Sequence, residues 1–369
     1  MKYYIIAGEA SGDLHASNLI KELKLLDGNA QFRCWGGDLM QVQGAILAKH
    51  YRDLAFMGFW EVLRNIFTII KNIRFCKKDI KSFDPDVLIL VDYPGFNLRI
   101  AKFAHLLNYK VFYYISPQLW AWKQSRVKLI RKVVDRMFVI LPFEKDFYKG
   151  FDFEVDFVGH PLLDAINLDS AESVNKALSK QIAILPGSRK QEISKMLPVM
   201  LSIKPHYPDH RFVIAGTSSV PKKFYDEYMK DPAGNMQGGV DIVFDKTYDV
   251  LRSSEAALVT SGTATLETAL LNVPEVVCYK SSAFSFFIAK YLIKTNYISL
   301  VNIMMEKEVV KELIQFEFNA DMLRKELDRL VNDNVYREKM LNNFIALKEK
   351  LGGSGASSNA ASLMIKYLR

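Results

Sequence analysis

Short apolar runs alternate with segments of helical periodicity along the chain. In the first half, residues 3–7, 87–91 and 111–115 are apolar runs of strand length, whereas residues 14–25 repeat apolar positions at helical spacing. Strands and helices in alternation are typical of a parallel sheet. This pattern predicts an α/β fold with a Rossmann-like domain in the first half.

The second half repeats the same pattern after a polar segment, residues 164–180. Its apolar runs are each followed by turn residues and then by helical periodicity; they are residues 182–185, 212–215, 242–244 and 256–259. We therefore predict two open parallel-sheet domains in tandem, with a cleft between them. The last segment, 321–369, is helical in pattern, and we interpret its Gly/Ser run at 351–356 as a hinge between helices.

Composition narrows the class of protein. Of 369 residues, 50% are apolar and 24% are charged, which excludes a disordered tail, a collagen-like repeat and a small disulfide scaffold. The net charge of +8 favours anionic partners such as phosphates, nucleic acid or acidic lipid. No stretch approaches about 18 uncharged apolar residues, so we expect no membrane-spanning helix.

Cysteines and histidines offer little chemistry. Cys34, Cys76 and Cys278 are far apart and lack zinc-ligand spacing, which favours a reducing, cytoplasmic location. The Asp84-Pro85-Asp86 sequence resembles a metal-binding DxD, but it precedes its predicted strand and so lies at the wrong end of the sheet. We expect neither a metal nor a cofactor.

Two candidate site segments follow predicted strands of the first half. The first turn contains Gly8, Glu9, Ser11, Gly12 and Asp13; it suits a ligand site, and equally a tight turn in which Asp13 caps the next helix. Asp92 follows the strand at 87–91 and is the best candidate for a general base, although it too could be a helix cap.

Three segments of the second half suit a nucleotide diphosphate. Ser188 and Arg189 follow a strand, and an arginine fork can bind two phosphate oxygens; the alternative is a surface turn. Residues 261–263, Ser-Gly-Thr, lie between a strand and a helix, whose N-terminal N–H groups attract anions. Glu267, one turn into that helix, could bind both hydroxyls of a ribose, and a capped helix without a ligand is the other interpretation.

Residues 56–78 form a predicted helix that is more apolar than one core face requires. Its cations are Arg64, Lys71, Arg74, Lys77 and Lys78, and such a ring around an apolar face suits an interfacial helix that contacts anionic lipid or acyl chains. The candidate contact residues are Met57, Phe59, Trp60, Leu63 and Phe67. An ordinary helix buried against the sheet is the alternative, and residues 283–294 pose the same question.

Taken together, these segments resemble the lipid-A-disaccharide synthases, glycosyltransferase family 19. The matching strings run through most of the chain: GEASGD at 8–13, MGFWEVL at 57–63, DYPGFN at 92–97, SPQLWAW at 116–122, LPFE at 141–144, LPGSR at 185–189, SGTATLE at 261–267, YISLVN at 297–302 and VKELIQ at 310–315.

The resemblance implies a GT-B fold with two Rossmann-like domains. Residues 1–165, completed by C-terminal helices at 340–369, would bind the acceptor and lipid, and residues 166–339 would bind the UDP-sugar. The implied reaction is an inverting, metal-independent transfer that joins UDP-2,3-diacylglucosamine to 2,3-diacylglucosamine 1-phosphate and releases UDP. It forms the β-1,6-linked disaccharide 1-phosphate of lipid A.

The resemblance also assigns roles to single residues. Asp92 would deprotonate the acceptor hydroxyl, Arg189 and residues 261–263 (Ser261, Gly262 and Thr263) would stabilise charge on UDP, and Glu267 would hold the ribose. Asn302 and Gln315 would line the donor side. A homodimer on the anionic cytoplasmic face of the inner membrane is expected from the same likeness.

Two positions depart from the family pattern. The family often has a second acid where this chain has Gly95, and a proline where it has Val301. The rival functions are a UDP-sugar epimerase, which would need no apolar helix ringed by cations, and a noncatalytic nucleotide- or lipid-binding protein. A nucleic-acid binder is disfavoured because the basic residues are not interleaved with exposed stacking aromatics.

Overall fold

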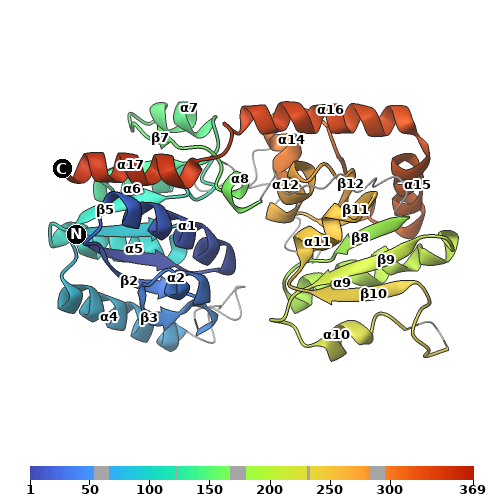
Figure 1. Cartoon of the computed structure of the whole chain (residues 1–369), viewed down its shortest axis with the longest axis horizontal. Helices are drawn as coiled ribbons and strands as arrows, with labels where there is room; N and C mark the ends of the chain where they lie inside the picture. The colour runs from blue at the N-terminus through green and yellow to red at the C-terminus, as the bar shows by residue number, and fades with distance from the viewer. Residues whose placement is uncertain (54–65, 121–123, 167–179, 231–232, 282–295) are drawn as a thin grey trace. The chain divides into compact units, whose positions relative to one another are not determined.

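The chain folds into two compact units. The computed structural model describes residues 1–53, 66–120, 124–166, 180–230, 233–281 and 296–369. One unit comprises Met1–Ala165 with Leu351–Arg369, and the other comprises Ile166–Lys350 (Figure 1). Residues 340–350 were expected to complete the first unit; this is wrong, since helix α16 (Asn334–Lys350) buries Met340, Phe344 and Leu347 within the second.

The first unit contains a parallel sheet in the order β3-β2-β1-β4-β5-β6-β7. Its strands are β1 (Lys2–Ala7), β2 (Gln31–Gly36), β3 (Ile46–His50), β4 (Val87–Val91), β5 (Lys110–Tyr114), β6 (Arg136–Val139) and β7 (Asp156–Phe157). Ala7 lies beside Val91, and Val91 beside Tyr114. The residues that follow β1, β4 and β5 therefore emerge at one edge of the sheet.

Helices cover both faces of this sheet, which explains why its central strands are apolar without interruption. The helices are α1 (Ala10–Leu26), α2 (Asp38–Val42), α4 (Ile66–Phe83), α5 (Pro94–Leu106), α6 (Val127–Val133), α7 (Glu144–Lys149), α8 (Leu162–Ala165) and α17 (Ala356–Leu368), with 3-10 turns η1 (Tyr51–Asp53) and η2 (Gln124–Arg126). Tyr3 and Ile5 point to one core, which α1 and α17 share. Tyr4 and Ile6 point to the other, against α4, α5 and α6.

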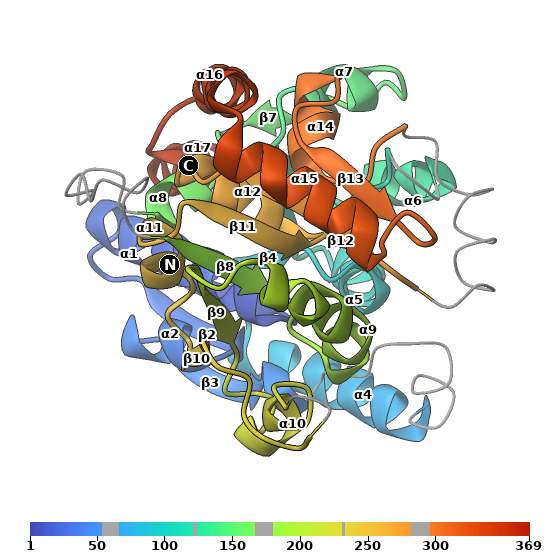
Figure 2. The ribbon, with the colours of Figure 1, turned by 90° about the vertical axis from the view of Figure 1, so that its right-hand side faces the viewer.

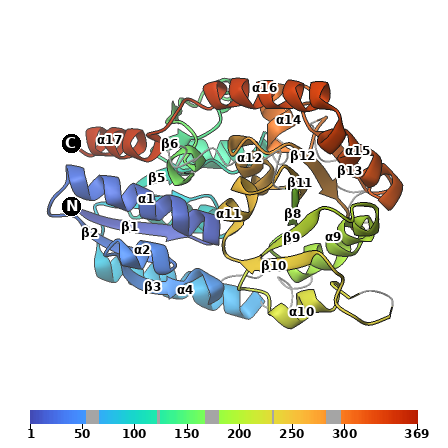
Figure 3. The same cartoon turned by 45° about the vertical axis from the view of Figure 1, so that its right-hand side comes forward.

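The last helix of the chain packs into the first unit. Figure 3 shows α17 and α1 near the N-terminus, and Ala360, Ala361 and Met364 of α17 are buried with Leu19 of α1. The Asp164 carboxylate caps α17, since it accepts the backbone N–H groups of Gly355 at 2.6 Å and Ser357 at 2.8 Å.

The second unit contains a parallel sheet in the order β10-β9-β8-β11-β12-β13. Its strands are β8 (Gln181–Leu185), β9 (Arg211–Gly216), β10 (Val240–Phe244), β11 (Ala256–Thr260), β12 (Glu275–Tyr279) and β13 (Lys311–Ile314). Its helices are α9 (Lys190–Ser202), α10 (Lys222–Asp226), α11 (Thr247–Arg252), α12 (Thr263–Leu270), α14 (Leu300–Met305), α15 (Ala320–Asn332) and α16, with η5 (Lys204–His206). Figure 2 shows α15 running across β11, β12 and β13. The predicted α/β class with two parallel sheets is confirmed.

Candidate active site

Asp92 lies at the carboxyl end of β4 in a left-handed backbone conformation. Its φ is 42°, and that of the following Tyr93 is 48°. The Asp92 carbonyl accepts hydrogen bonds from Asn97 Nδ2 at 2.7 Å and from the Tyr113 hydroxyl at 2.6 Å, while its N–H donates to Tyr114 at 3.2 Å. Left-handed conformations are costly for such residues, so these three bonds are what hold Asp92 at the sheet edge.

The electrostatic surroundings of Asp92 suit a general base. Burial and, to a lesser extent, the nearby Glu9 carboxylate together raise the pKa of its carboxyl to about 7, against a hydrogen bond from the Tyr93 backbone that lowers it. A general base must be ionised at the working pH, and it accepts a proton more readily as its pKa rises. A pKa near 7 therefore satisfies both requirements at neutral pH.

The turn after β1 lies directly beside Asp92. A side chain at Gly8 would place its Cβ 2.4 Å from the Tyr93 ring, so only glycine fits there. A Cβ at Gly12 would lie 3.2 Å from that of Ala7, and Ser11 is exposed in the first turn of α1. Glu9 is the N-terminal capping residue of α1 and is half-buried. The structure thus brings Gly8, Glu9 and Asp92 together.

Asp13 was expected either in the ligand-binding turn or as the cap of its own helix, and the structure shows it capping a different helix. It is buried, and its carboxylate accepts the backbone N–H groups of Gly37 at 2.7 Å, Leu39 at 3.2 Å and Met40 at 3.2 Å. These groups belong to the start of α2, so Asp13 caps α2 and not its own helix. Both oxygens of the Asp13 carboxylate therefore bind backbone groups of the protein.

Sequence reasoning missed another acid near this edge, the buried Glu144. It accepts the N–H groups of Ile140 at 3.2 Å and Leu141 at 3.0 Å, and burial raises its pKa to about 7 against those hydrogen bonds. Ser116, whose hydroxyl lies 2.6 Å from that of Tyr148, also hydrogen-bonds this carboxyl. The signal was present in the LPFE string, where an acid begins a helix just after a strand.

In the second unit, residues 261–263 form the turn that leads into α12. Ser261 donates its N–H to Cys278 at 3.1 Å and its hydroxyl to the Ile298 carbonyl at 3.1 Å. Gly262 and Thr263 are exposed, and no side chain in the described part of the chain caps the helix. Its first N–H groups can therefore bind an anion.

Arg189 lies in the loop between β8, which pairs with β11, and α9. Leu185 lies beside Val259, so the loop at Ser188 and Arg189 leaves the sheet next to Ser261. The Glu192 carboxylate accepts the N–H of Ser188 at 3.0 Å and pairs with Arg189 Nη1 at 2.8 Å. Since a guanidinium carries five N–H donors, Arg189 keeps others for a phosphate.

Glu267 and Gln315 complete this edge. Glu267 is half-buried, accepts the Tyr248 hydroxyl at 3.0 Å, and has its pKa raised by burial. Gln315 follows β13 with φ at 55° and pairs with Ser281, to which its Nε2 donates at 2.9 Å. One oxygen of Glu267 therefore has one protein partner, and the carboxylate keeps acceptor sites on both oxygens for ribose hydroxyls.

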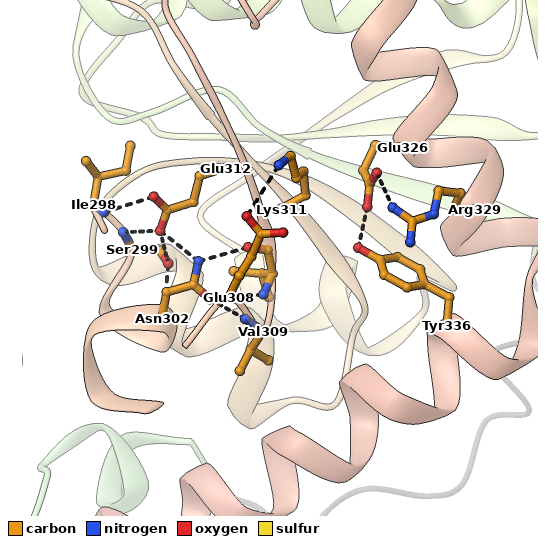
Figure 4. A network of polar contacts seen from close by, with 11 residues as sticks. Ile298, Ser299, Asn302, Glu308, Val309, Lys311, Glu312, Glu326, Arg329 and Tyr336 are labelled. Carbon is orange, nitrogen blue, oxygen red and sulfur yellow. Dashed lines mark hydrogen bonds and ion pairs between the residues drawn. The ribbon is translucent and has the colours of Figure 1, made fainter. Parts of the chain in front are cut away.

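Asn302, which the resemblance places on the donor side, is surrounded by protein groups in this structure. It is 0% exposed, and its amide is saturated by protein groups (Figure 4). Its Oδ1 accepts the N–H groups of Val309 at 2.7 Å and Val310 at 3.0 Å, and its Nδ2 donates to Val310 and Glu312, both at 2.9 Å.

The expected acyl-contact residues divide between described and undescribed segments. Met57, Phe59, Trp60 and Leu63 lie outside the described residues. Phe67 on α4 is 83% exposed. Farther along α4, Cys76 and Ile80 are buried against the sheet, while Lys71, Arg74 and Lys78 are exposed. The described part of the helix thus has an inner face in the core and an exposed apolar start flanked by cations.

Within the described ranges, no cluster of three or more histidine, cysteine or acidic side chains could hold a metal ion. No described helix is both long enough and apolar enough to cross a bilayer.

Comparison with protein families matches residues 3–364 to the lipid-A-disaccharide synthetase family. A lipid-A-disaccharide synthase of Geobacter metallireducens is 38% identical over 376 residues, covering 99% of this chain and 96% of the relative. That of Nitrosococcus oceani is also 38% identical, covering 99% and 95%.

Solved structures share the fold at low sequence identity. A UDP-GlcNAc 2-epimerase from Neisseria meningitidis bound to UDP-GlcNAc is 15% identical, with a TM-score of 0.69 over 99% of this chain and all of the other. Acinetobacter baumannii MurG is 15% identical, with a TM-score of 0.57 over 99% of both chains. The architecture is therefore of the GT-B type, and the family match over almost the whole sequence establishes that this chain belongs to the lipid-A-disaccharide synthases, the glycosyltransferases of lipid A biosynthesis.

Proposed function

We propose that this enzyme transfers 2,3-diacylglucosamine from UDP to the 6-hydroxyl of 2,3-diacylglucosamine 1-phosphate, with inversion and without a metal ion. UDP and the β-1,6-linked disaccharide 1-phosphate are the products. The first unit binds the acceptor, and the second binds the UDP-sugar.

The placement of Asp92 carries this proposal. Its carboxyl sits at the end of a central strand, is held there through its own backbone, and has a pKa of about 7 through burial and Glu9. Asp92 removes the hydroxyl proton as the acceptor oxygen bonds to the anomeric carbon and the bond to UDP breaks.

The donor side stabilises the leaving group. The start of α12 and Arg189 provide N–H donors and positive charge for the diphosphate, whose negative charge grows as the glycosidic bond breaks. Glu267 accepts the ribose hydroxyls at the acceptor sites that its hydrogen bond from Tyr248 leaves open.

The decisive experiment follows UDP release and disaccharide mass with both substrates in detergent and EDTA. Wild-type protein should form disaccharide, and Asp92→Asn should lose activity by at least about a hundredfold. Asp84→Asn is a matched control, because Asp84 also has a left-handed backbone but precedes β4 at the opposite edge. UDP release without disaccharide would contradict the acceptor, and unimpaired Asp92→Asn would contradict the base.

We further propose that the enzyme acts as a homodimer on the cytoplasmic face of the inner membrane. The support for membrane contact is the exposed Phe67 beside Lys71 and Arg74 on α4. The resemblance supports the dimer, and light scattering of the purified protein in detergent tests it.

A further inference from the structure

A buried polar network is linked by hydrogen bonds to the turn that begins α12 in the second unit. Its centre is Glu312 on β13, with Ser299 and Asn302 at the start of α14 (Figure 4). Ser299 and Asn302 are fully buried, and Glu312 is buried as well. None of these side chains is open to a ligand.

Glu312 accepts four hydrogen bonds. Its Oε1 accepts the Ser299 N–H at 2.9 Å, the Ser299 hydroxyl at 2.7 Å and Asn302 Nδ2 at 2.9 Å. Its Oε2 accepts the Ile298 N–H at 3.0 Å. Buried networks in which every group is paired fix one geometry, because any displacement leaves a polar group without a partner.

The network reaches the diphosphate segment through Ile298. Glu312 fixes the N–H side of Ile298, whose carbonyl accepts the Ser261 hydroxyl at 3.1 Å. Ser261 is the residue before Gly262, the N-terminal cap of α12. A hydroxyl has one proton, so in this arrangement Ser261 anchors the turn and leaves anion binding to the backbone N–H groups and Thr263.

We propose that Glu312, Ser299 and Asn302 are positioning residues for the turn that begins α12, and that they set the affinity for the UDP diphosphate without touching it. This inference rests on the proposed function of the second unit. Asn302 holds the segment at Val309 and Val310 against Glu312, and Glu312 holds Ile298 against Ser261.

Titration calorimetry with UDP tests the inference on the full-length protein. Glu312→Gln places an amide N–H₂ against groups that are themselves donors, so the dissociation constant for UDP should rise about tenfold or more. Glu326→Gln is the matched control. Glu326 is also buried in this unit, where it accepts the Tyr336 hydroxyl and pairs with Arg329 at 2.9 Å (Figure 4), and neither of these partners belongs to the α12 turn. Its UDP affinity should stay within about twofold of wild type.

If the role were purely structural, two variants with the same loss of melting temperature would lose UDP affinity by the same factor, and that result would overturn the inference. Wild-type UDP affinity in a folded Glu312→Gln protein would overturn it as well. Should Glu312→Gln fail to fold, Ser299→Ala decides: it removes one of the four bonds, and several-fold weaker UDP binding is expected, whereas unchanged binding would overturn the inference. In turnover, the KM for the UDP-sugar should rise while that for the acceptor stays the same. A wild-type protein that does not bind UDP would refute the proposed function itself.

Discussion

At the scale of single residues, the candidate site contains backbone conformations and carboxyl groups that are energetically costly. Asp92, Tyr93 and Ile115 all have left-handed backbones where strands β4 and β5 end, with φ at 42°, 48° and 65°. Such conformations persist only where the surroundings enforce them, and Ile115 is β-branched, which makes its conformation the costliest. The fold also imposes the surroundings that raise the pKa values of Asp92 and Glu144.

The acid side of the pH profile should report Asp92. A base must be deprotonated, so kcat/KM should fall as pH drops below about 7, the pKa to which burial raises Asp92. Since the Glu9 charge contributes to that rise, Glu9→Gln should move the acidic limb to lower pH. The measurement is a pH–rate profile of both proteins; an unmoved limb would show that Glu9 does not tune the base.

Glu275 should make the second unit less stable at alkaline pH. It is fully buried at the start of β12, neither oxygen has a hydrogen-bond partner among the described residues, and burial raises its pKa well above the usual range. A carboxyl whose folded pKa is raised favours folding below its unfolded pKa of about 4.3, and this contribution is lost as pH rises toward the folded value. The free energy of unfolding of Glu275→Met, relative to that of wild type, should therefore be at least about 1 kcal/mol more favourable to the folded state at pH 8 than at pH 5.

Denaturant unfolding at the two pH values measures this gain. The exposed Glu317→Met is the control, and it should show no pH-dependent gain. Equal stabilities of wild type and Glu275→Met at both pH values would mean that Glu275 has a partner in solution.

At the scale of elements, α4 combines two environments in one helix. Cys76 and Ile80 pack in the core of the first unit, whereas Phe67 and Ile70 are exposed near the helix start. The apolar pattern of the sequence could not separate these environments, because both faces are apolar and only the position of the sheet decides which one is covered.

Removing the exposed aromatic should weaken membrane binding. Phe67→Glu removes the free energy of about 1.5–3 kcal/mol that an aromatic side chain gains on leaving water, and it adds a negative charge. Binding to anionic vesicles should therefore fall at least about tenfold. Flotation with phosphatidylglycerol vesicles measures it. Val335→Glu, at an exposed apolar position of α16, should bind as wild type does; equal binding by both variants would place membrane contact elsewhere.

Helix caps show where local sequence reasoning fails. Asp13 looked like a cap or a ligand of its own turn, yet its partners lie 24 to 27 residues later at the start of α2. The donor-side role of Asn302 came from the family resemblance alone, and in this structure Val309, Val310 and Glu312 pair with its amide. A polar residue after a strand has the same local pattern whether its partner is a ligand or a distant backbone group, so the sequence alone cannot distinguish the two.

At the scale of the whole molecule, the chain passes from the first unit to the second and returns. The apolar runs predicted the central strands at 3–7, 87–91 and 256–259 well, because buried parallel strands have few alternatives. The return point was predicted one helix too early, since α16 and α17 are both helical in pattern and only their packing assigns them to different units.

That return makes the stability of the first unit depend on the end of the chain. Met364 of α17 is fully buried in the core shared with α1, so Met364→Ala should cost about 2–5 kcal/mol in the first unit. Met340→Ala, on α16, should destabilise the second unit instead. Hydrogen exchange resolved by peptide checks both, and faster exchange of the same unit in the two variants would contradict this division.

The anchoring of Asp92 through its backbone also makes one variant useful as a tool. Asn97 and Tyr113 hold its carbonyl, and the carboxylate accepts the Tyr93 N–H, a bond that an amide oxygen can also make. Asp92→Asn should therefore keep the architecture while losing the proton acceptor. Such a protein would capture donor and acceptor side by side without consuming them, and so provide the crystals in which the reacting complex can be seen.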